Sequence, residues 1–267
     1  MTEPQILLTN DDGIRSPGLW AAAAALSEIG FVHVAAPRDQ FSGAGRSLPI
    51  TSDGVIRTEQ VGVNGKLWQV HAVGGTPAQA VLHGVLEITP EIPALVVSGI
   101  NYGENLGTGI TVSGTVGAAL EAASMGLPAL AISLETKQEH HLSYSEEVDF
   151  TAAAHFAALF GRILLQRTMP EDVFVLKVDV PSDATPDTAW ELTRLSRRRY
   201  FEPTAPERTS WDVPARVGYQ LSGDPTEAEK GTDVYAVCRE RKISVTPLSL
   251  DMTSRVDFKQ LEEILRV

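Results

Sequence analysis

The first 181 residues alternate between short apolar runs and segments with helical periodicity, and this order constrains the fold more than any other feature of the sequence. Apolar runs of strand length occupy residues 6–9, 31–36, 94–99, 129–133 and 173–181. Segments in which apolar residues recur with helical spacing lie between them, at residues 17–29, 76–88, 115–126 and 144–167. A strand followed by a helix and another strand gives parallel strands with right-handed crossovers. We therefore predict an α/β fold with a doubly wound, Rossmann-like and mostly parallel sheet.

Two regions depart from this alternation. Residues 55–73 are rich in β-forming residues around Asn64-Gly65, a pair typical of a tight hairpin turn. Beyond Pro181 the chain becomes rich in proline and charge, and residues 233–250 favour a β-hairpin outside the main sheet, followed by a short helix near residues 258–265. We therefore predict a Rossmann-like α/β core over residues 1–181 and an extension over residues 182–267 that packs on it.

Composition limits the classes of partner. The formal net charge of -12 is opposite to the basic surface that nucleic-acid polymers and anionic membranes require. Cys238 is the single cysteine, so no intramolecular disulfide can form, and the N-terminal residues lack the pattern of a signal peptide. No apolar stretch is long enough to span a bilayer. We expect a cytoplasmic protein that binds neither nucleic-acid polymers nor membranes.

Polar side chains follow three of the predicted strands. Asp11 and Asp12 come directly after the first apolar run, Ser42 lies in the loop after the second, and Asn101 follows residues 94–99. The carboxyl ends of parallel strands converge on one edge of a doubly wound sheet, where ligands bind. A set of carboxylate, hydroxyl and amide oxygens suits Mg²⁺ or Mn²⁺ better than zinc. The competing interpretation is that one aspartate caps a turn while the other is solvated, and that Ser42 and Asn101 are ordinary turn residues.

A glycine-rich stretch, residues 98–122, carries the second candidate site. Its residues Ser113, Gly114 and Thr115 immediately precede a predicted helix. The free N–H groups and positive dipole end of a helix start can bind a phosphate. The alternative is that these glycines only permit tight turns and close helix packing, and the spacing of a P-loop is absent.

Several distinctive motifs follow one another in order over residues 6–253. They are LLTNDDGIRSPG, APRDQFSGAGRSL, GGTPAQAV, LVVSGINYGENLG, SGTVGAALEAASMGLPALAIS, RRRYFEP and GTDVYAVCRERKISVTPLSLDMT. Together these motifs resemble the SurE family of metal-dependent 5′/3′-nucleotidases. The resemblance implies one divalent ion, Mg²⁺ or Mn²⁺, held by Asp11, Asp12, Ser42 and Asn101. It also implies that Ser113, Gly114 and Thr115 lie beside the substrate phosphate, with Asn101 bridging toward it.

The same resemblance implies that the extension is swapped between subunits to build a dimer and, in some members, a tetramer. The implied reaction is hydrolysis of nucleoside monophosphates to nucleoside and phosphate. We hypothesise that Asp11, Asp12 and Asn101 are catalytic, with Asp11 chiefly on the metal and Asp12 able to activate water. Two alternatives stay open: a phosphatase that uses Asp11 as covalent nucleophile, and a nucleotide-binding stress protein without turnover.

Overall fold

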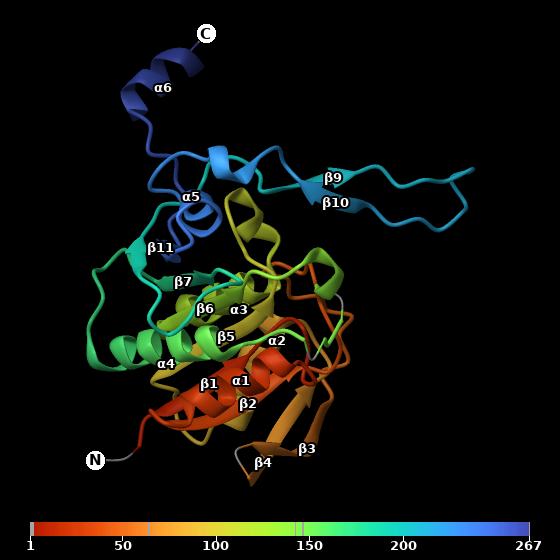
Figure 1. Cartoon of the computed structure of the whole chain (residues 1–267), viewed down its shortest axis with the longest axis vertical. Helices are drawn as coiled ribbons and strands as arrows, with labels where there is room; N and C mark the ends of the chain where they lie inside the picture. The colour runs from red at the N-terminus through yellow and green to blue at the C-terminus, as the bar shows by residue number, and fades with distance from the viewer. Residues whose placement is uncertain (1–2, 64, 142, 146, 267) are drawn as a thin grey trace.

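The computed structural model describes residues 3–63, 65–141, 143–145 and 147–266. The predicted turn at Asn64-Gly65 therefore lies partly outside the described residues. Figure 1 shows a central sheet with helices on both faces, an arm that projects from one end and a C-terminal helix that stands apart from the rest.

The sheet has nine strands in the order β3-β4-β2-β1-β5-β6-β7-β11-β8. Neighbouring strands are parallel except at the pairs β3–β4 and β7–β11, so the predicted doubly wound and mostly parallel sheet is confirmed. The strand bounds are β1 Gln5–Thr9, β2 Phe31–Pro37, β3 Ile56–Val63, β4 Lys66–Val73, β5 Leu95–Tyr102, β6 Ala129–Leu134, β7 Val175–Val180, β8 Trp190–Leu192 and β11 Ile243–Leu248.

Helices cover both faces of the sheet and bury its apolar side chains. On one face pack α1 (Pro17–Leu26) and α4 (Thr151–Gln166), and on the other α2 (Pro77–His83) and α3 (Gly114–Ser124). Three short helical segments lie in the connections between these elements, at η1 (Gly84–Ile88), η2 (Thr108–Val112) and η3 (Gln138–His140). No helix among the described residues is both long enough and apolar enough to cross a membrane.

Local sequence explains where these helices begin. Thr76 and Gln79 form a reciprocal capping box at the start of α2, and the Ser113 hydroxyl accepts from the backbone N–H of Val116 at the start of α3. The predicted helix over residues 144–167 begins only at Thr151. Tyr144 lies outside this helix and contacts the end of β1, where its hydroxyl donates to the backbone oxygen of Asp12.

The hairpin predicted over residues 233–250 is wrong. Residues Asp233–Cys238 form helix α5, and β11 lies inside the main sheet between β7 and β8. Thr232 caps α5 through its side chain, while β11 is buried on both faces. Burial on both faces is typical of a central strand. The local sequence pattern alone does not distinguish such a strand from one strand of a hairpin. The division at residue 181 stays a prediction, and β8 and β11 on its C-terminal side belong to the main sheet.

A different hairpin forms the projecting arm. Strands β9 (Phe201–Thr204) and β10 (Gly218–Leu221) pair antiparallel and extend from the body (Figure 1). The arm contacts η3, because the side chain of Gln138 donates to the backbone oxygen of Tyr219. The short turn η4 (Pro225–Glu227) leads from the arm to α5. The terminal helix α6 (Phe258–Leu265) is present as predicted, and none of its residues is buried.

A buried ion cluster joins β7 to α5. Lys177 is fully buried and its ammonium group contacts the carboxylates of Asp179 and Asp233, the latter at 3.3 Å. The same ammonium donates to the backbone oxygen of Asn105 at 2.8 Å, and the backbone N–H of Gly107 donates to Asp233 at 2.9 Å. The cluster therefore fixes the loop after β5 as well as α5.

Replacing Lys177 by Met leaves two buried carboxylates without a cation. We expect Lys177→Met to lower the free energy of unfolding by about 3–5 kcal/mol, measured by urea denaturation. Lys242→Met is the matched control, because Lys242 also contacts two carboxylates, Glu191 and Glu240, but lies at the surface. The control should change stability little, and equal losses in the two variants would contradict a special role for the buried cluster.

Candidate active site

Asp11 and Asp12 lie in a tight turn at the carboxyl end of β1. The side chain of Asn10 shapes this turn, because its oxygen accepts from the backbone N–H of Gly13 and its amide nitrogen donates to the Gly13 oxygen. Gly13 has a φ of 94°, a conformation that favours glycine. Both aspartates are buried, with exposures of 5% and 3%, so the interpretation in which one of them is solvated does not hold.

The loop after β2 packs against this turn. The backbone N–H of Phe41 donates to the backbone oxygen of Asp11 at 2.8 Å, and the side-chain amide of Gln40 donates to Oδ1 of Asp12 at 3.1 Å. Oδ2 of Asp12 accepts from the backbone N–H of Tyr102 at 3.0 Å. Three strand ends thus converge as expected for a doubly wound sheet, and they hold Asp12 from both sides.

The start of α3 contacts Asp11 directly. The Thr115 hydroxyl donates to Oδ1 of Asp11 at 2.5 Å, and the backbone N–H groups of Gly114 and Thr115 also hydrogen bond to this carboxylate. A Cβ at Gly114 would lie 2.7 Å from the Cβ of Asp11, so glycine is required by this approach. The helix start therefore faces Asp11 with the positive end of its dipole.

One cavity of about 380 Å³ contains most of the predicted site. Asp11, Ser42, Asn101 and Ser113 line it together. The other three predicted residues contact this lining: Asp12 bonds to Tyr102, and both Gly114 and Thr115 contact Asp11. The structure thus brings the predicted residues together, while the role of each one stays a prediction.

The two aspartates form a site of concentrated negative charge. Burial raises the pKa of Asp11, and hydrogen bonds from Thr115 and the backbone partly offset this rise. Burial raises the pKa of Asp12 well above its usual range, and the neighbouring charge of Asp11 adds to the effect. Adjacent buried carboxylates with raised pKa values favour the uptake of positive charge, either as a proton or as a cation.

The oxygen donors at this position fit a hard divalent cation. Asn101 donates from Nδ2 to the backbone oxygen of Gly103 at 2.6 Å, which leaves its Oδ1 as the atom that can coordinate. Among the described residues, His, Cys, Asp and Glu form no group of three or more that could hold a metal ion. A cation at Asp11 and Asp12 would therefore take its other protein ligands from neutral oxygens, for which Ser42 and Asn101 are placed.

Further residues contact Asp12 or line the cavity without belonging to the predicted site. The side chain of Gln40 and the hydroxyl of Tyr144 bond to Asp12, while Glu104, His141, Phe201 and Tyr219 line the cavity. Arg199, from an arginine-rich run next to an aromatic residue, lines it too. The arginine-rich run is the one sequence feature that points to any of these residues. The remaining residues belong to no motif, and segments far apart in the sequence bring them together.

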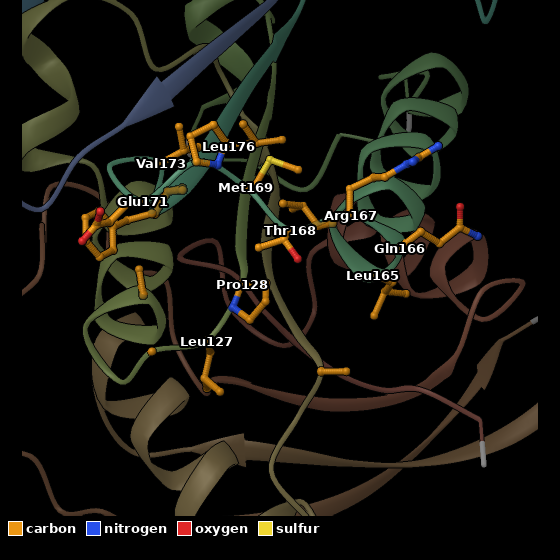
Figure 2. A pocket seen from close by; sticks show the side chains of 17 residues that line it. Leu127, Pro128, Leu165, Gln166, Arg167, Thr168, Met169, Glu171, Val173 and Leu176 are labelled. Atoms are coloured by element: carbon orange, nitrogen blue, oxygen red, sulfur yellow. The ribbon is translucent and has the colours of Figure 1, made fainter. Parts of the chain in front are cut away.

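A larger cavity of about 510 Å³ lies at the opposite edge of the sheet. It is lined by residues just before β6 and β7 and at the end of α4, and Figure 2 shows aliphatic side chains such as Leu127, Pro128 and Met169 in its wall. The amino ends of the strands meet there, so this cavity does not contain the converging carboxylates.

Comparisons with known proteins identify the family of this chain. Residues 6–202 match the family model described as survival protein SurE. The chain belongs to the SurE family. It is 47% identical to the 5′-nucleotidase SurE of Thermococcus gammatolerans, over 98% of this chain and 96% of that protein.

Further relatives extend the similarity. The 5′-nucleotidase SurE of Archaeoglobus fulgidus is 46% identical over 97% of this chain and 96% of its own length. The crystal structure of the SurE protein from Aquifex aeolicus superposes with a TM-score of 0.74 at 32% identity and covers 98% of both chains. SurE membership thus spans nearly the whole chain, including the part beyond residue 181.

The charge pair at Asp11 and Asp12 can be tested without an activity assay. In EDTA at pH 8, we expect Asp11→Asn to be more stable than the unmodified protein, on the order of 1–3 kcal/mol, because one of two adjacent buried charges is gone. Asparagine keeps an oxygen to accept from Thr115. Urea denaturation provides the measurement, and Asp187→Asn, at an exposed carboxyl, is the control that should change little.

Addition of Mn²⁺ should reverse this order. The unmodified protein should gain stability from the cation by mass action, whereas Asp11→Asn should gain much less. Equal stabilisation of both proteins by Mn²⁺ would show that Asp11 does not bind the cation.

Proposed function

We propose that this protein is a metal-dependent phosphomonoesterase that hydrolyses nucleoside 5′- and 3′-monophosphates to nucleoside and phosphate. The convergence of Asp11, Ser42, Asn101 and Ser113 on one cavity carries the proposal. The names of the relatives, which are 5′-nucleotidases, support the nucleotide substrate. The single, free Cys238 supports a reducing cytoplasm as the place of reaction.

In this proposal Asp11, Asp12, Ser42 and Asn101 hold one divalent ion, Mg²⁺ or Mn²⁺. The bound ion would lower the pKa of water and neutralise charge on the phosphoryl oxygens. Asp12 is oriented by Tyr102 and Gln40, so its carboxylate is fixed in place to accept a proton from the attacking water. Ser113 and Asn101 face the cavity as ligands for the substrate phosphate. Gly114 and Thr115, the other two phosphate ligands that the sequence predicts, hydrogen bond to Asp11 at the start of α3 and so hold it in place.

The alternative with Asp11 as covalent nucleophile requires a free carboxylate oxygen and forms an aspartyl phosphate. In the structure Oδ1 of Asp11 accepts from Thr115, and the carboxylate also accepts from the backbone at the start of α3. These bonds stabilise the charge and reduce the nucleophilicity of Asp11, which favours a role in cation binding. Rapid acid quench during turnover tests this alternative, because a phosphorylated Asp11 in the quenched protein would replace the proposed mechanism.

The activity itself is tested by phosphate release from a panel of 5′- and 3′-nucleoside monophosphates with Mg²⁺, Mn²⁺ or EDTA. We expect release with either metal and none with EDTA. Asp12→Asn should lower kcat/KM at least about a hundredfold at saturating metal, because it removes a proton acceptor and a cation ligand.

Asp187→Asn is again the matched control and should keep its activity, since Asp187 is exposed and lies outside the cavity. Metal-independent release, or Asp12→Asn as active as the control, would contradict the mechanism. Tight nucleotide binding without any turnover would favour the stress-related binding protein instead.

We also propose that the protein forms a homodimer, or a tetramer built from dimers, through a C-terminal extension swapped between subunits. Helix α6 supports this proposal, because Phe258, Leu261, Ile264 and Leu265 are all exposed. An isolated eight-residue helix with an apolar face is marginally stable in water and gains stability by packing against another surface.

Deletion of residues 254–267 should therefore lower the oligomeric state, as measured by light scattering. The deletion removes no residue of the cavity or of the main sheet. An unchanged molar mass per particle, corrected for the missing residues, would show that α6 does not build the assembly.

A further inference from the structure

Three aromatic rings from separate segments meet in the wall of the active-site cavity. His141 follows η3, Phe201 lies on β9 and Tyr219 lies on β10, and all three line the cavity that contains Asp11 and Asn101. The ring of Phe201 stands nearly perpendicular to both others, with centroids 6.0 Å from His141 and 5.3 Å from Tyr219. The base of the arm therefore forms part of the cavity wall, through Phe201 and Tyr219.

His141 and Tyr219 form a nearly flat pair. Their ring planes differ by only 10°, and Nδ1 of His141 lies 3.0 Å from the Tyr219 hydroxyl oxygen. Because the two planes are nearly parallel, their spacing cannot exceed this 3.0 Å contact, which is shorter than the spacing of stacked rings. The two rings therefore lie side by side, not one over the other. Two rings side by side present a broad aromatic surface, and Tyr219 is 37% exposed.

A buried carboxyl group lies beside this surface. Glu104 lines the same cavity, is only 7% exposed, and its Oε2 has no hydrogen-bond partner among the described residues. Burial raises the pKa of Glu104 to about 7, although the Tyr200 hydroxyl hydrogen bonds to the carboxyl group and opposes this rise. A buried acceptor without a partner is costly, and a ligand that brings an N–H group would offset this cost.

We propose that His141, Phe201, Tyr219 and Glu104 form a base subsite, in which the nucleobase of the substrate stacks on the aromatic surface and donates an N–H to Glu104. This inference rests on the proposed nucleotidase function and adds the part of the substrate that the phosphate site does not bind. The cavity volume of about 380 Å³ lies within the range of small-molecule sites. The binding of a base then makes the enzyme prefer nucleotides to sugar phosphates.

The test compares adenosine 5′-monophosphate with ribose 5-phosphate, which has the same phosphoryl sugar without the base. We expect the ratio of their kcat/KM values to be well above one in the unmodified enzyme. Tyr219→Ala should lower this ratio about tenfold to a hundredfold, the effect of losing one base-stacking ring. Tyr219→Phe should keep the ratio within about threefold, because it retains the ring.

Trp211→Ala is the matched control, since Trp211 is an exposed aromatic residue in the same arm that does not line the cavity. It should leave the ratio unchanged. Glu104→Gln keeps the size of the side chain and one acceptor oxygen but removes the carboxylate charge. Because a hydrogen bond to a charged acceptor is stronger, this variant should lower the ratio several-fold without lowering the midpoint of thermal unfolding. A purely structural role of Glu104 would instead lower stability and both kcat/KM values together.

The outcomes separate the two proposals. A ratio near one, or a ratio unaffected by Tyr219→Ala, overturns the base subsite while the nucleotidase function stands. An equal fall for both substrates would also overturn it, because the arm would then support only the phosphate site. If neither substrate is hydrolysed, the proposed function fails. Calorimetry with adenosine 5′-monophosphate then decides, since binding weakened by Tyr219→Ala but not by Trp211→Ala supports the subsite, and any other pattern rejects it.

Discussion

The placement of two adjacent carboxylates in the interior, at the end of a central strand, is the constraint on which the site depends. Asp11 and Asp12 are both buried. Burial raises the pKa of each carboxyl group, and the charge of Asp11 raises the pKa of Asp12 further. The surrounding protein supplies backbone and side-chain donors, but no cationic side chain contacts either carboxylate among the described residues. A bound cation is the simplest group that would balance this charge, and Ser42 and Asn101, the proposed neutral ligands, line the same cavity as Asp11.

The fold explains how these groups come together. Parallel strands β1, β2 and β5 end at the same edge of the sheet, so their loops meet there, and α3 begins beside them. The buried cluster of Lys177, Asp179 and Asp233 hydrogen bonds to the backbone of the loop after β5 and connects this loop to α5. Residues beyond the predicted boundary at 181 thus support the cavity, and the base of the arm adds aromatic side chains to its wall.

The sequence was sufficient for the core of the fold and for the charged part of the site. Strand-to-helix alternation predicts a doubly wound sheet, and strand ends in such a sheet converge, so the joint location of Asp11, Ser42 and Asn101 follows from their positions alone. The contributions of Gln40, Tyr144 and Tyr219 could not be predicted in this way. Gln40 and Tyr144 lie in long loops and Tyr219 lies in the arm. Hydrophobic periodicity predicts helices and strands, but it does not predict where such segments pack in the fold. Strand β11 was misassigned for a related reason, because a short run of β-forming residues does not show which strand it will pair with.

The central claim is that Asp11 and Asp12 hold a divalent cation together with Ser42 and Asn101. Anomalous diffraction from crystals grown with Mn²⁺ tests it most directly. The account predicts one strong anomalous peak per chain, within coordination distance of oxygens from these four side chains. The absence of a peak at this position, or a peak bound by other residues, would contradict it.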